Sequence, residues 1–92
     1  MSTPQLGRLR EDIERIDREI VQRIADRVRL AREAGVAKNA SGLPTLDHAR
    51  EANVVRQAVE LAREAGLECD EEIRHIFWQL IGLCRRAQSH DD

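Results

Sequence analysis

Aromatic residues and cysteines are scarce in this 92-residue chain. It has no tyrosine, and Phe77 and Trp78 are its only aromatic rings, so a core must be built from Ile, Leu, Val and Ala. The two cysteines, Cys69 and Cys84, are too few and too far apart for a disulfide framework or a zinc knuckle. We therefore expect neither a fold held together by disulfides nor a metal site.

Long apolar runs and an excess of one charge are also missing. No stretch approaches the roughly 20 apolar residues that a membrane-spanning helix needs, and residues 1–12 lack the hydrophobic centre of a signal peptide. Charged residues make up 35% of the chain, yet the net charge is only −2, with arginines interleaved among Asp and Glu. Such a surface gives no field for nucleic acid or anionic lipid. We expect a cytoplasmic protein that binds neither nucleic acid nor a membrane.

The apolar residues recur at helical spacing, and no segment alternates with the period of a strand. The sequence therefore predicts an all-α fold in a single domain, residues 1–92. We expect three helices, at about residues 6–38, 48–65 and 71–88.

Residues between the expected helices carry turn and capping signals. Ser, Gly and Pro cluster in the loop 39–47. Asp47 is a good N-cap for the second helix, and Gly66 is suited to end it. Asp70 is placed to cap the third helix. Gly35 lies inside the first helical pattern, where we expect it to bend or fray the end of the helix.

The first helix is too long for a compact monomer. About 33 residues span about 50 Å, whereas a compact 92-residue globule is only roughly 32 Å across. The apolar stripe continues along the overhanging part, through Leu6, Leu9, Ile13, Ile16, Ile20 and Ile24. Because exposed apolar surface costs about 25 cal/mol per Å², we predict an intertwined homodimeric helical bundle in which a second copy covers the stripe.

A cation interrupts this stripe. Arg27 lies between Ile24 and Ala31, where an aliphatic residue is expected. Lys38 follows eleven residues later, on nearly the same face and about 16 Å along the axis. Two long cationic side chains at this spacing could hold a small anion between them.

The other two helices also carry polar residues on their apolar faces. Glu51 is aligned with the apolar stripe of the second helix, and Gln88 continues that of the third. Buried charges need partners, and two readings stay open: an anion-binding pocket, or a structural ion-pair network in which Arg27 pairs with Glu51. Arg10 lies about 25 Å before Arg27 and could join such a pocket only from a partner chain.

Ordered motifs from about Leu9 to Gln88 resemble the all-helical (AroQ-type) chorismate mutases. The matching segments are "LREDIERID", "ADRVRLA", the lysine of "VAK", "LPTLDHAREANV" and "IFWQLIGLCRRAQ". The resemblance implies a dimer of three-helix chains with two equivalent sites. It also implies the rearrangement of chorismate to prephenate, on the way to phenylalanine and tyrosine, without a cofactor or metal.

The resemblance assigns roles by position. Arg27 and the partner chain's Arg10 would bind the two substrate carboxylates. Lys38 and Gln88 would donate to the ether oxygen, where negative charge develops as the bond breaks.

Four further positions complete the implied site. Glu51 would accept from the ring hydroxyl, helped by the backbone of Asp47, and so act with Arg27, Lys38 and Gln88 in catalysis. Arg50 would brace the site beside the ring carboxylate. Cys84 stands where family members often have Ser near a carboxylate, so that hydrogen bond is weaker or lost.

Several alternatives remain at this point. Mutases acting on 4-amino-4-deoxychorismate share the same features, and Glu51 could face an ammonium as readily as a hydroxyl. Isochorismate–pyruvate lyases share the fold but lack a matching Arg–Glu pair at the start of the second helix. The chain could also be a non-catalytic helical dimer, or a regulatory partner in a complex with a larger aromatic-pathway enzyme.

Overall fold

The computed structural model describes residues 3–89, which form three α-helices and no strand. The helices are α1 (Pro4–Ala40), α2 (His48–Glu64) and α3 (Asp70–Ser89). The all-α prediction is confirmed, and each helix begins and ends within two residues of its expected bounds. No helix in this part of the chain has an apolar stretch long enough to cross a bilayer.

Both ends of α1 extend two residues beyond the predicted helix. At the start, the Thr3 hydroxyl accepts a backbone N–H of the first turn at 3.0 Å, and Pro4 occupies the first helical position, where a missing N–H costs nothing. At the end, Gly42 takes a positive φ of 71°. This lets the Leu43 N–H return to the Lys38 carbonyl at 2.9 Å and close the last turn.

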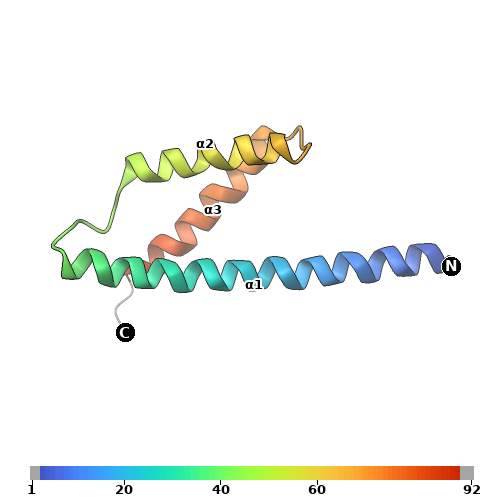
Figure 1. The fold of residues 1–92 in the computed structure, drawn as a ribbon, viewed down its shortest axis with the longest axis horizontal. Coiled ribbons are helices and arrows are strands. Elements are labelled where there is room, and N and C mark those ends of the chain that lie inside the picture. The colour runs from blue at the N-terminus through green and yellow to red at the C-terminus, as the bar shows by residue number, and fades with distance from the viewer. Residues whose placement is uncertain (1–2, 90–92) are drawn as a thin grey trace.

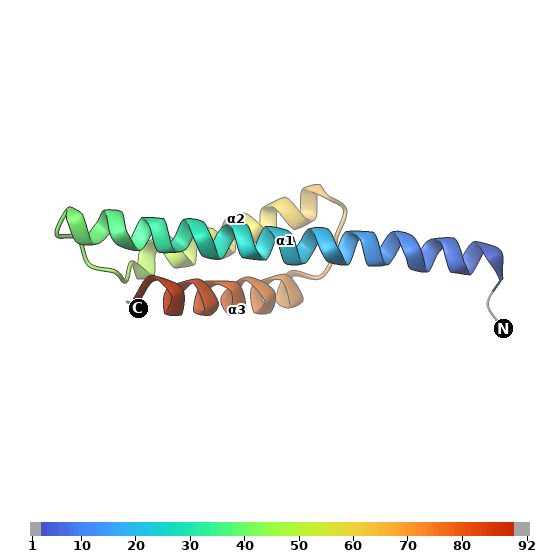
Figure 2. The ribbon, with the colours of Figure 1, turned by 90° about the horizontal axis from the view of Figure 1, so that it is seen from below.

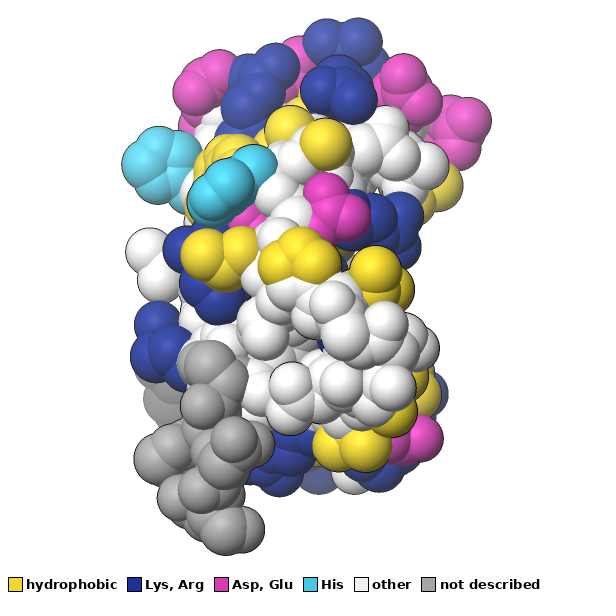
Figure 3. Space-filling view, turned by 90° about the vertical axis from the view of Figure 1, so that its left-hand side faces the viewer, with side chains coloured by type: hydrophobic (Ala, Val, Ile, Leu, Met, Phe, Trp, Pro, Cys, Tyr) yellow, Lys and Arg dark blue, Asp and Glu magenta, His cyan; other side chains and the backbone are white. Residues whose placement is uncertain are grey.

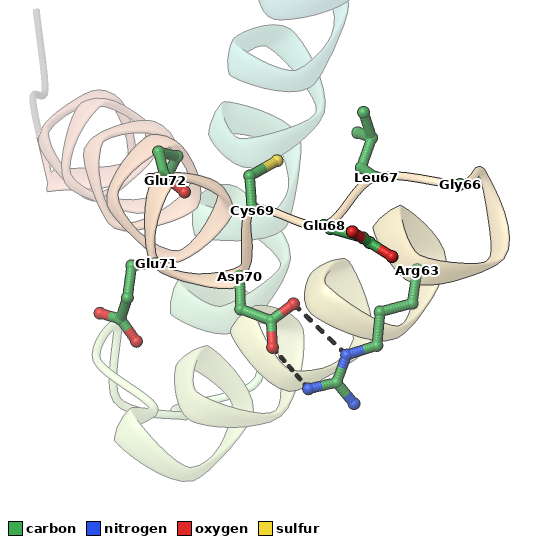
Figure 4. Close-up of a pocket in the computed structure, with 8 residues that line it drawn as sticks. All are labelled: Arg63, Gly66, Leu67, Glu68, Cys69, Asp70, Glu71 and Glu72. Atoms are coloured by element: carbon green, nitrogen blue, oxygen red, sulfur yellow. Dashed lines mark hydrogen bonds and ion pairs between the residues drawn. The ribbon is translucent and has the colours of Figure 1, made fainter.

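The ends of α2 follow the predicted signals, whereas the start of α3 departs from them. The Asp47 carboxylate accepts the Arg50 N–H at 3.0 Å and caps α2, and Gly66 (φ 87°) follows its last turn. Asp70, expected to precede the third helix as its cap, is instead the first residue of α3. Its carboxylate accepts two hydrogen bonds from Arg63 of α2, which ties the turn together (Figure 4).

Helix α3 crosses diagonally between the other two helices and packs on both (Figure 1). Within residues 3–89, no Cα atom of α1 comes within 8 Å of one in α2, so α3 alone joins them. The buried residues are mostly small: Ala31, Val55, Ala58, Val59, Ala62, Ile81, Cys84 and Ala87. The predicted inward faces of α2 and α3 are therefore confirmed, but the core of one chain is thin.

The N-terminal half of α1 projects alone beyond α2 and α3 (Figures 1 and 2). Its stripe is uncovered in the single chain, with Leu9, Ile13 and Ile20 each at least 50% exposed. The radius of gyration is 17.0 Å, against about 12 Å for a compact chain of this length. The predicted overhang of the first helix is thus confirmed, while its cover by a second copy stays a prediction.

Hydrophobic side chains are also open to solvent at the end of the molecule where α1 turns into α2 (Figure 3). Val36, Leu43 and Leu46 are between 46% and 71% exposed. In the same view, acidic and basic side chains gather at the top. The single chain therefore leaves apolar surface exposed at more than one place.

Gly35 does not bend or fray α1, contrary to expectation. It is buried within the continuous helix and faces the backbone of Gln88 in α3. A Cβ atom at this position would lie 3.1 Å from the Gln88 carbonyl oxygen. The close approach of α3 to α1 favours glycine here, because an added Cβ atom would force the neighbouring backbone to shift by a few tenths of an ångström.

We predict opposite effects of alanine at two glycines of α1. Gly35→Ala should lower the free energy of unfolding by about 1 kcal/mol, since overpacking against Gln88 outweighs the gain in helix propensity. Gly7→Ala should raise it by about 0.5–1 kcal/mol, because nothing lies within 4 Å of the added methyl group. Urea unfolding at matched protein concentration measures both, and equal stabilisation by the two changes would contradict the close-approach role of Gly35.

Candidate active site

A pocket of about 540 Å³ lies where the three helices and the α1–α2 loop meet. Its volume is in the usual range for small-molecule sites. Seven of the eight sequence-predicted site residues line it: Arg27, Lys38, Asp47, Arg50, Glu51, Cys84 and Gln88.

The eighth residue, Arg10, does not line this pocket. It is exposed on the projecting half of α1, seventeen residues and about 25 Å from Arg27 along the helix axis. A single chain therefore does not bring Arg10 to the other predicted residues.

The pocket lining is cationic, although the chain as a whole is slightly acidic. It contains four cations and two carboxylates, a formal net charge of +2: Arg27, Lys38, Arg50 and Arg85 against Asp47 and Glu51. A concave surface with this charge concentrates small anions. The arrangement suits a ligand with two negative charges.

A second pocket, of about 660 Å³, lies at the turn between α2 and α3. Figure 4 shows its lining, in which Arg63 is the single cation. Its carboxylates are Glu68, Asp70, Glu71 and Glu72. This excess of negative charge repels anions, so the turn is not the predicted anion site.

Lys38 and Gln88 meet inside the first pocket. The Lys38 Nζ donates to the Thr45 carbonyl at 3.0 Å and to Gln88 Oε1 at 3.3 Å. Because an ammonium group can only donate, the oxygen of the Gln88 amide faces Lys38 and its NH₂ group points elsewhere. These contacts use two of the three ammonium N–H groups of Lys38, so one remains for a ligand.

Arg27 contacts a neutral partner. Its Nη1 lies 3.0 Å from the Cys84 sulfur, which is buried between α1 and α3. Cys84 thus accepts from the guanidinium in the position where the resemblance implied a contact with a ligand carboxylate. The remaining N–H groups of Arg27 are available to an anion in the pocket.

Glu51 pairs with Arg85, a residue that the sequence analysis missed. Arg85 Nη2 lies 2.5 Å from Glu51 Oε1, and Nε lies 3.2 Å from Oε2. The hydrogen bond from Arg85 lowers the pKa of Glu51 below its ordinary value of 4.5, and the His48 ring at 3.5 Å adds to the effect when protonated. Glu51 is therefore a carboxylate at neutral pH.

An ion-pair network built from the predicted residues would pair Glu51 with Arg27. In the structure Glu51 pairs with Arg85 instead. A signal for Arg85 was present, because it precedes Gln88 by three residues and so shares its helix face. The hydrogen bond from Lys38 to Thr45 could not be read from the sequence, because it uses a backbone carbonyl, which every residue has.

Asp47 and Arg50 border the pocket at the start of α2. The Asp47 carboxylate is engaged as the helix cap, and its carbonyl accepts the N–H of Glu51 at 3.0 Å. Arg50 is exposed and adds a cation at the pocket edge. Among residues 3–89 there is no cluster of His, Cys, Asp and Glu that could hold a metal ion.

Comparison with known proteins gives a consistent result over most of the chain. The sequence model of the family described as "Chorismate mutase type II" matches residues 9–89. A bifunctional chorismate mutase/prephenate dehydratase of Aquifex aeolicus is 32% identical over 82 residues, which cover 87% of this chain and 23% of that protein. Intracellular chorismate mutases of Mycobacterium bovis and Mycobacterium tuberculosis are 38% identical over 58 residues, 63% of this chain and 55% of theirs.

The chain therefore spans about half the length of the mycobacterial relatives and about a quarter of the Aquifex protein. No solved structure was found to match it.

We predict that the Glu51 carboxyl loses its depressed pKa when Arg85 is neutralised. In Arg85→Gln the pKa should rise toward 4.5, and carbon-detected NMR titration of the carboxyl group measures it. Since the folded-state pKa is the lower one, the pair stabilises the fold above about pH 4.5, and this contribution disappears as pH falls through the depressed pKa.

Arg63→Gln is the matched control, because the same argument applies to the exposed pair at the other turn. It should raise the pKa of Asp70 and leave Glu51 unchanged. A Glu51 pKa that does not move in Arg85→Gln would contradict the assigned pairing.

Proposed function

The chain belongs to the type II chorismate mutase family, and on this premise we propose that it catalyses the rearrangement of chorismate to prephenate. Chorismate carries two carboxylates, and the pocket carries a net charge of +2. The observation that carries the proposal is the Lys38–Gln88 pair, which places an ammonium group and a side-chain amide together in a cationic pocket.

Binding of the substrate rests on the arginines. Arg27 offers its remaining N–H groups to one carboxylate, and Arg50 braces the site from the start of α2. A guanidinium suits this task because its donors match the two oxygens of a carboxylate. Held at two points, the flexible dianion is restricted to the conformer that can react, which supplies part of the rate enhancement.

The bond change itself needs no nucleophile or proton transfer. The ether C–O bond breaks as a new C–C bond forms, and negative charge develops on the ether oxygen. Lys38 and the NH₂ group of Gln88 donate to that oxygen in our mechanism and stabilise the transition state. Glu51, ionised by its contact with Arg85, accepts the ring hydroxyl of the substrate.

The active form, in our proposal, is a homodimer in which α1 packs along α1 of a second copy. The exposed stripe on the projecting half of α1 supports this association. In an antiparallel arrangement Arg10 of each chain reaches the pocket of the other and supplies the second carboxylate-binding cation.

We place the activity in the cytoplasm and in the synthesis of phenylalanine and tyrosine. The names of the mycobacterial relatives, intracellular chorismate mutases, support the location. The Aquifex relative combines chorismate mutase with prephenate dehydratase in one chain. That combination supports a complex between this chain and another enzyme of the same pathway.

We predict that the purified protein consumes chorismate and that Gln88→Glu confines this activity to acid pH. A glutamine amide donates at any ordinary pH, whereas Glu donates only when protonated and otherwise repels the charge on the ether oxygen. Lys38 should favour the ionised form of the new Glu and lower the pH at which activity appears. Loss of chorismate absorbance between pH 4.5 and 8 measures both proteins.

Two results would count against this proposal. Wild-type protein that leaves chorismate unchanged would reject the assigned activity. Gln88→Glu with the wild-type pH profile would remove Gln88 from the catalytic role.

We predict that two inactive variants restore activity when their subunits exchange. Arg10→Ala and Lys38→Ala each damage both sites of their own homodimers. In the mixed dimer both lesions fall in one site and leave the other intact, so about a quarter of wild-type activity is expected from random exchange. Native mass spectrometry verifies exchange, and mixed dimers without activity would contradict a site shared between chains.

A further inference from the structure

Arg85 is a charged residue of the pocket to which the proposed mechanism gives no direct task. It follows Cys84 on α3, and its side chain is 40% exposed, whereas that of Glu51 is only 15% exposed. Two hydrogen bonds join the groups, so each carboxylate oxygen of Glu51 holds one N–H of the guanidinium. Of the two partners, the cation is therefore the more exposed.

This contact changes what Glu51 can bind. A carboxylate oxygen has two lone pairs, so each can accept a second hydrogen bond while Arg85 stays in place. A neutral hydroxyl group needs only such a lone pair to donate its hydrogen bond. An ammonium group binds best to a carboxylate whose negative charge is not already compensated. Bound to Glu51, it would also lie next to the Arg85 guanidinium and be repelled by it.

Other charges around Glu51 also disfavour the binding of an ammonium group. Lys38 and Arg27 of α1 and Arg50 of α2 line the same pocket, and His48, 3.5 Å away on the same helix as Glu51, adds a positive charge only when it is protonated. One carboxylate besides Glu51, that of Asp47, also lines the pocket, where it caps α2. The surroundings of Glu51 are thus positive overall.

We infer that Arg85 is a specificity-determining residue, which makes Glu51 select a ring hydroxyl over a ring ammonium. The inference rests on the proposed function and narrows it: the substrate is chorismate, and 4-amino-4-deoxychorismate is discriminated against. Arg85 acts through Glu51, so it positions and neutralises the carboxylate and does not itself take part in the bond change.

A competition experiment tests this inference. Both compounds are supplied at equal concentration in one reaction, and the two products are quantified by chromatography, so the ratio does not depend on the amount of folded enzyme. Wild-type protein should favour chorismate. Arg85→Gln keeps a donor but loses the charge, and should lower the preference by about tenfold or more.

Two variants serve as controls. Arg85→Lys keeps the charge but loses the two-point contact with Glu51, and should retain more of the preference than Arg85→Gln. Arg86→Gln neutralises the exposed neighbouring arginine and should leave the preference unchanged. If Arg85→Gln does not fold, Arg85→Met supplies a second neutral variant.

The outcomes separate this inference from the proposed function. An unchanged preference in an Arg85→Gln protein that still consumes chorismate overturns the role of Arg85 and leaves the mutase activity standing. Equal losses in Arg85→Gln and Arg85→Lys overturn the electrostatic basis. A wild-type preference for the amino compound also overturns the inference, and wild-type protein that converts neither compound rejects the proposed function and the inference together.

Discussion

The close approach of α3 to α1 at Gly35 is the contact on which the site depends. A Cβ atom at Gly35 would lie 3.1 Å from the Gln88 carbonyl oxygen, and the side-chain amide oxygen of the same Gln88 accepts a hydrogen bond from Lys38 at 3.3 Å. One turn earlier along α3, Cys84 meets Arg27. The pocket therefore takes its shape from helix packing together with the α1–α2 loop, which supplies Thr45 and Asp47.

The pairing of charges distinguishes a ligand site from a structural ion-pair network. Within residues 3–89, Arg27 and Lys38 have only neutral partners: a thiol, a carbonyl and an amide oxygen. Their positive charges therefore remain uncompensated and available to an anion. Glu51, in contrast, is neutralised by Arg85. The same pocket thus combines these cations with a carboxylate that is already paired.

The single chain buries few large apolar side chains, which makes its stability depend on whether a second copy binds. The core consists of small residues on three helices that only α3 connects, and the projecting half of α1 exposes a row of large aliphatic side chains. If a second copy covers this row, as we propose, folding and association are coupled, and the apparent stability rises with protein concentration. The same association would complete the site by adding Arg10.

Local sequence signals predicted the three helices, the N-cap at Asp47, and the inward faces that carry Glu51 and Gln88. These features follow from local backbone chemistry and from helical periodicity, which operate within a single element. Only the tertiary structure decided that Glu51 pairs with Arg85, that Lys38 binds the carbonyl of Thr45, and that Gly35 makes room for α3. Such contacts depend on how two helices are rotated and spaced relative to each other, and periodicity within one helix does not specify that relation.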